Sequence, residues 1–83
     1  MEISSELLEK LAEAIHVDWM EGKLRDGWKY GTVIDKAMKI HNCLIPYERL
    51  AEADKESDRY IARGIPKLLE SVGYKIVKMD EKC

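Results

Sequence analysis

The arrangement of apolar residues constrains this chain most: two long stretches with helical spacing flank a segment that has no regular period. The first stretch, residues 6–26, reads ELLEKLAEAIHVDWMEGKLRD. Its apolar side chains recur at steps of three and four residues and share one helix face: Leu8, Leu11, Ala12, Ile15 and Trp19. Ser4 and Ser5 supply N-caps, and Gly27 suits the positive φ that ends many helices. We therefore expect a long amphipathic helix here.

The second stretch, residues 52–73, predicts another amphipathic helix. Its apolar stripe, which we expect to be buried, comprises Ile61, Ile65, Leu68, Leu69 and Val72. Gly73 is the expected C-terminal stop. Pro66 lacks an N–H and Gly64 loosens the same turn, so the sequence predicts a kink or a break near residues 64–66.

The segment between the helices, residues 28–47, shows neither a helical nor a strand period. Its aromatic and apolar residues indicate a long ordered loop, with short extended pieces and a single helical turn at 35–39. Residues 74–79, YKIVKM, alternate apolar and basic side chains, which predicts a short half-buried C-terminal β-strand. The predicted fold is mainly α, with two long amphipathic helices packed together.

Length and charge limit the classes of protein. The 83 residues predict a single domain over 1–83, with a core at about 5–78 and a frayed tail at 79–83. Lys and Arg number 14 against 16 Asp and Glu, and the interspersed charges argue against nucleic-acid binding. No apolar run approaches the roughly 18 residues that a membrane span needs, so no membrane partner is expected. The acidic N-terminal segment and only two cysteines, Cys43 and Cys83, predict a cytoplasmic protein with reduced thiols.

The residues that carry most catalytic and metal chemistry are few. The histidines are His16, inside the first helix, and His41, two residues before Cys43. The HNC stretch lacks the flanking glycines or helix N-terminus that would lower a thiol pKa. A zinc site needs about four ligands at a recognisable spacing, which this sequence does not offer. We interpret the chain as a protein that is not an enzyme and that uses no cofactor or metal.

The stretch DGWKYG, residues 26–31, places the rings of Trp28 and Tyr30 on one side of an extended segment. Two readings stay open: the rings fill a core beneath the loop, or they face a ligand. Arg59 likewise fits either a carboxylate or carbonyl of the chain itself or a ligand phosphate. A stacking surface beside a cation suits a nucleotide-like ligand. The candidate ligand-binding residues are Trp19, Trp28, Lys29, Tyr30, His41, Tyr47 and Arg59.

Five motifs in order resemble the ryanodine receptor repeat, the RyR domain. They are LAEAIHVDW (11–19), GWKYG (27–31), HNCLIPYERL (41–50), KESDR (55–59) and LLESVGYKI (68–76), and the match spans residues 7–77. The resemblance implies a mostly helical module. Such modules form tandem pairs in animal calcium-release channels and occur alone or fused in bacteria. Thr32 and Asn42 stand where family members often carry proline, whereas the proline of GIPKLL is similar to bacterial members and predicts a bacterial source.

The residues and the resemblance together favour a non-catalytic binding or regulatory module. It would recognise a protein partner or a small nucleotide-like ligand, with no channel activity, because the chain has no pore segment and a single repeat. The alternative is a structural module that assembles as a homodimer, motivated by the small size and by the paired packing that the resemblance implies. A helix-turn-helix-like nucleic-acid binder is a third reading, which the acidic balance disfavours.

Overall fold

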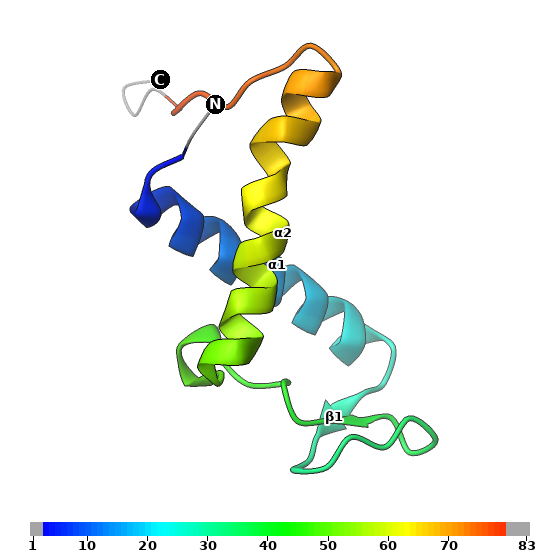
Figure 1. The fold of residues 1–83 in the computed structure, drawn as a ribbon. Helices are drawn as coiled ribbons and strands as arrows, with labels where there is room; N and C mark the ends of the chain where they lie inside the picture. The colour runs from blue at the N-terminus through cyan, green and yellow to red at the C-terminus, as the bar shows by residue number, and fades with distance from the viewer. Residues whose placement is uncertain (1–2, 80–83) are drawn as a thin grey trace.

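The computed structural model describes residues 3–79. Its elements are the helix α1 (Ser5–Arg25), the strands β1 (Lys29–Tyr30) and β2 (Ile40–His41), the 3₁₀ helix η1 (Tyr47–Arg49) and the helix α2 (Glu52–Ser71). The helices α1 and α2 pack against each other and cross near their middles, and the two short strands lie beyond the C-terminal end of α1 (Figure 1). The mainly α fold with two packed helices is confirmed.

The helix ends follow the capping residues. Ser4 caps α1, and its Oγ accepts the N–H of Leu7 at 3.1 Å. Gly27 and Gly73 follow α1 and α2 with φ of 91° and 88°, a region that side chains other than glycine rarely adopt. Both glycines therefore end their helices as the sequence predicts.

Pro66 lies inside α2, which continues from Glu52 to Ser71. Of the kink or break predicted near residues 64–66, the break is therefore wrong, and the kink stays a prediction. An interior proline costs a helix about 3 kcal/mol, because it removes one backbone hydrogen bond and crowds the preceding turn. Its ring is buried, and the burial of that apolar surface offsets part of the cost.

The long loop is ordered by a small parallel sheet. Lys29 pairs with Ile40 and Tyr30 with His41, and an isolated bridge joins Asp35 to Ile40. Residues 36–39 form a turn in place of the predicted helical turn. Gly31 is required at this point, because a Cβ there would collide with Cγ2 of Ile40.

Residues 74–79 form no β-strand, so that part of the fold prediction is wrong. The only sheet in the described residues lies at the opposite end of the molecule (Figure 1), and a strand needs a neighbouring edge to pair with. The segment instead runs back past the start of α1, where Ile76 and Val77 line a depression together with Leu7. Of the predicted frayed tail, Met79 is 87% exposed and 80–83 lie outside the described residues.

The core is small. Within residues 3–79 the buried apolar side chains are Ala12, Leu44, Tyr47, Leu50, Ala62 and Pro66, and the one buried polar side chain is His16. The stripe expected to be buried on α2 is largely exposed: Ile61, Leu68 and Val72 are 53%, 68% and 67% exposed. The helix turns Ala62 and Pro66 inward instead, which shifts the buried face by one residue from the predicted one.

A substitution at Ala62 tests how closely the two helices approach. Ala62 on α2, like Ala12 on α1, has no exposed surface, so Ala62→Leu forces extra volume into a filled space. We expect a loss of about 1–3 kcal/mol in the free energy of unfolding, measured by chemical denaturation. The matched control is Ala53→Leu, at an exposed position of the same helix. Equal stabilities of the two variants would show that Ala62 is not tightly packed.

Candidate functional site

The carboxylate of Glu9 accepts hydrogen bonds from two of the candidate residues, Tyr47 and Arg59. Its Oε2 accepts the hydroxyl of Tyr47 at 3.0 Å, and its Oε1 accepts Nε of Arg59. The same guanidinium donates from Nη1 to Oε2 of Glu52 at 3.0 Å. Hydrogen bonding to Arg59 lowers the pKa of both Glu9 and Glu52, while burial and the bond to Glu9 raise the pKa of Tyr47.

The donors of Arg59 therefore face carboxylates of the chain itself, one of the two readings that the sequence left open. A third carboxylate, Glu56, lies 3.8 Å from Nη1. The ring of Tyr47 is buried beneath Lys55, whose Nζ lies 5.6 Å from the ring centroid. A ligand-binding role for Arg59 and Tyr47 stays a prediction, and such a ligand would compete with these contacts.

A second cluster surrounds two histidines. His16 is 3% exposed, and its Nε2 donates to the backbone carbonyl of Ile45 at 2.7 Å, which fixes a proton on Nε2. In His41, Nδ1 accepts the N–H of Cys43 at 3.0 Å, which requires that nitrogen to be unprotonated. Burial and the nearby Lys23 lower the pKa of His41, so both observations favour its neutral form.

Three predicted site residues lie together: Trp19, Trp28 and His41. The ring centroids of Trp19 and His41 lie 4.9 Å apart, edge to face, and those of Trp28 and His41 lie 6.2 Å apart. Lys23 Nζ sits 4.3 Å from the centroid of Trp28 and 6.0 Å from that of Trp19. These four side chains form a cluster of rings in edge-on and tilted contact beside a cation.

The other candidates from DGWKYG lie outside this cluster. Lys29 and Tyr30 are both exposed, and Tyr30 keeps 54% of its surface. Trp28, just before β1, is half-buried. The two rings therefore differ in environment: Trp28 packs with the cluster, and Tyr30 faces solvent.

Sequence reasoning missed Lys23 and two carboxylates, Asp54 and Asp58. Lys23 lies four residues after Trp19, a spacing that places both on one helix face and could have suggested the contact. The two carboxylates have the same spacing on α2, but acidic residues in the first turns of a helix ordinarily face solvent, so the sequence gives no signal for them. They line a hollow of about 250 Å³ where α1, the loop and α2 meet. Its lining residues are His16, Trp19, His41, Cys43, Leu50, Asp54, Asp58 and Ile61.

The thiol in this hollow is not activated. Burial, together with the charge of Asp54 and the thiol hydrogen bond to it, raises the pKa of Cys43. A thiolate is the nucleophilic form of cysteine, so this environment disfavours nucleophilic chemistry. Cys83, the second cysteine of the sequence, lies outside the described residues.

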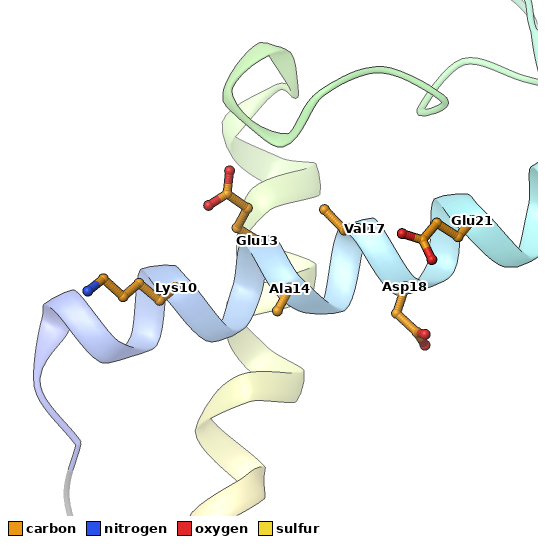
Figure 2. Close-up of a pocket in the computed structure, with 6 residues that line it drawn as sticks. All are labelled: Lys10, Glu13, Ala14, Val17, Asp18 and Glu21. Atoms are coloured by element: carbon orange, nitrogen blue, oxygen red, sulfur yellow. The ribbon is translucent and has the colours of Figure 1, made fainter. Parts of the chain in front are cut away.

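A larger depression of about 390 Å³ lies on the outer face of α1 (Figure 2). All six residues that line it come from this one helix, and Figure 2 shows Glu13 and Val17 on one side and Ala14 and Asp18 on the other. No second element converges on them. The depression is an acidic helix surface rather than a site.

Residues 3–79 contain no group of three or more His, Cys, Asp or Glu side chains placed to hold a metal ion. Neither helix in this range combines the length and apolarity needed to cross a membrane.

The crossed helix pair, the loop pinned beside it and the ring cluster at its end define a small, mainly α-helical module. The model of one family, the RyR domain, matches residues 2–78. The chain belongs to the RyR domain family, as the resemblance indicated. The RyR domain is a non-enzymatic module.

The Glu9 cluster predicts a specific response to acid. The pKa values of Glu9 and Glu52 lie below their ordinary 4.5 in the folded protein, so their contribution to stability is present above pH 4.5 and is lost as pH falls through the lowered values. We expect Glu9→Gln to lower the unfolding temperature near neutral pH and to differ less from the wild type in acid. Thermal unfolding between about pH 7 and about pH 3 measures this.

The control for the acid response is Glu13→Gln, at an exposed position of α1. It should track the wild type across the whole pH range. A difference between Glu9→Gln and the wild type that stays constant in acid would contradict the role assigned to the carboxylate of Glu9.

Proposed function

We propose that this RyR domain is a non-catalytic protein-interaction module, and that the exposed apolar face of α2 is its contact surface, occupied by a second copy of the chain. The observation that carries the proposal is the exposure of Ile61, Leu68 and Val72. With Ile65 these residues recur at steps of four, three and four, the spacing of a coiled-coil seam. We call these four residues the α2 stripe.

The solvent-accessible surface of the chain is larger than expected for a compact monomer, which supports an interface with a partner. The chain exposes 6613 Å², whereas a compact monomer of this length exposes about 5,100 Å². The radius of gyration, 15.3 Å, likewise exceeds the roughly 12 Å of a compact domain of this size. A standard interface buries about 800 Å² on each partner, which is less than the excess. Association along α2 would therefore cover surface that the monomer leaves open.

Small residues beside the stripe favour a second helix as the occupant. Ser57, Gly64 and Ser71 recur every seven residues along α2. A Cβ at Gly64 would meet no atom within 4 Å, so the packing of the chain itself does not require glycine there. An interior glycine costs a helix about 1 kcal/mol, and close approach of another backbone would offset that cost. A second copy presents the same stripe, and two-fold pairing matches like surfaces.

Leu68→Glu tests the proposal, because it places a charge in the centre of the stripe. We expect the wild type to be dimeric at high concentration and Leu68→Glu to be monomeric, as measured by light scattering over a concentration series. The matched control is Val33→Glu, which alters a side chain 74% exposed in the loop and should leave the dimer intact. Circular dichroism checks that the variants keep their helices. A wild type that is monomeric at every concentration would refute the proposal.

The ring cluster supports a second candidate function, binding of a nucleotide-like ligand. The observation that favours it is Lys23, 4.3 Å from the centroid of the half-buried Trp28. A base stacked on Trp28 gains about 1–3 kcal/mol, and Lys23 with the exposed Lys29 would meet the phosphates. A cytoplasmic location and a bacterial source remain predictions from the sequence.

Thermal shift with purine nucleotides tests this second function. We expect a concentration-dependent rise in the unfolding temperature of the wild type and none in Trp28→Ala. Tyr74→Ala, which removes a ring 70% exposed outside the cluster, is the control and should respond as the wild type does. A flat wild-type response, or an equal response in Trp28→Ala, would exclude the cluster as the binding site.

A further inference from the structure

Residues 30–38, which we call the tip loop, expose apolar side chains at the end of the molecule opposite residues 74–79 (Figure 1). Its four large apolar side chains are each at least 49% exposed: Tyr30, Val33, Ile34 and Met38. Single exposed apolar residues are ordinary on a protein surface, but several in one short segment mark an interaction surface. We propose that the tip loop binds the surface of a lipid bilayer that contains anionic lipids.

The charge around the tip loop is opposite to that of the chain as a whole. Residues 25–39 contain four lysine and arginine residues against two aspartates, whereas the rest of the chain contains ten against fourteen aspartates and glutamates. One of these cations, Lys39, is paired, because its Nζ lies 3.8 Å from Oδ2 of Asp26. The other three are exposed and form no side-chain ion pair or hydrogen bond within residues 3–79: Arg25, Lys29 and Lys36. An anionic lipid surface would complement this positive charge.

The combination of apolar and basic side chains favours a bilayer over other anionic partners. A free phosphate would leave the aliphatic side chains of Val33, Ile34 and Met38 in water. Single-stranded nucleic acid binds to successive aromatic rings, and the tip loop has one ring, Tyr30. A second copy of the loop would bring like charges together. At a bilayer the apolar side chains would enter the interface, while the basic groups stay level with the lipid phosphates.

The backbone of the tip loop is fixed before any contact forms. The strands β1 and β2 pair with each other, and the bridge between Asp35 and Ile40 closes the turn between them. Oδ1 of Asp35 also accepts the N–H of Met38 at 3.2 Å. The loop would therefore lose little further conformational freedom on binding, which favours association.

The contact would be shallow and peripheral. Irregular backbone is not tolerated in contact with the hydrocarbon region, so only side chains would leave water. Such a contact does not require the roughly 18 apolar residues of a membrane span, on whose absence the expectation of no membrane partner rested. Val33, Ile34, Met38 and Lys36, which carry the inference, belong neither to the α2 stripe nor to the ring cluster.

The test is flotation of the protein with unilamellar vesicles, made either of phosphatidylcholine alone or of an equimolar mixture with phosphatidylglycerol. We expect saturable binding to the mixed vesicles that weakens at high salt, and little binding to phosphatidylcholine alone. Val33→Glu should weaken binding at least tenfold, because the carboxylate resists transfer to the interface and repels anionic lipid. Val77→Glu, the same change at a side chain 69% exposed at the opposite end of the molecule, should bind as the wild type does.

The charge is tested separately with Lys36→Gln, which should weaken binding to the mixed vesicles about fivefold. Its matched control is Lys75→Gln, an exposed lysine outside the tip loop, which should leave binding unchanged. Leu68→Glu should still prefer the mixed vesicles, so the result does not depend on whether the chain dimerises through the α2 stripe. Circular dichroism checks that each variant keeps its helices.

Several results would overturn the inference. They are equal binding to both kinds of vesicle, no binding to either, and wild-type affinity in both Val33→Glu and Lys36→Gln. Displacement of the protein from the vesicles by glycerophosphoglycerol or by oligouridylate, at the same phosphate concentration, would assign the loop to a free phosphate or to a nucleic acid instead. Loss of the dimer in Val33→Glu, measured by light scattering, would assign the loop to a second copy of the chain.

Discussion

The carboxylate of Glu9 is the interaction on which the arrangement of the molecule depends. One oxygen holds the hydroxyl of Tyr47 and the other holds Arg59, so a single side chain on α1 fixes both the loop and α2. The buried apolar core is too small to fix the crossing of the helices by itself. Glu9 is 45% exposed, so water screens its charge. Its hydrogen bonds therefore contribute more to fixing how the helices and the loop are arranged than to the free energy of folding. The two oxygens specify which turn of α2 meets which turn of α1.

The inward face of α1 has an unusual composition that explains this dependence. Glu9, Ala12 and His16 are separated by three and four residues and lie on one face. Ala12 is fully covered and lets the elements approach, while the two flanking side chains reach across to the loop and α2. The helix is therefore anchored by a polar residue on each side of a small one. Its half-buried aliphatic side chains sit beside this face rather than on it: Leu7, Leu8, Leu11 and Ile15.

Local chemistry made much of the fold predictable, and long-range pairing made the rest unpredictable. Caps, glycine stops and periodicity located both helices, because these signals act within a few residues. The face that α2 buries depends on what α1 presents, and α1 presents an alanine and polar groups where the periodicity of α2 suggested an apolar partner. The same limit applies to the site. Of the candidate residues, Trp19, Trp28 and His41 lie together, and a ligand-binding role for them stays a prediction. Asp54 and Asp58 line a hollow with Trp19 and His41 only through the path of the loop.

The distribution of charge follows from the same pairing. Arg59 was the natural candidate for meeting an anion, yet three carboxylates surround its guanidinium. Its positive charge is thereby neutralised inside the fold, whereas no lysine or arginine lines the neighbouring hollow that contains Asp54 and Asp58. The positive charge that remains near the rings belongs to Lys23, at the end of α1. One small module thus separates an acidic hollow from a basic ring cluster, with Trp19 and His41 as the boundary between them.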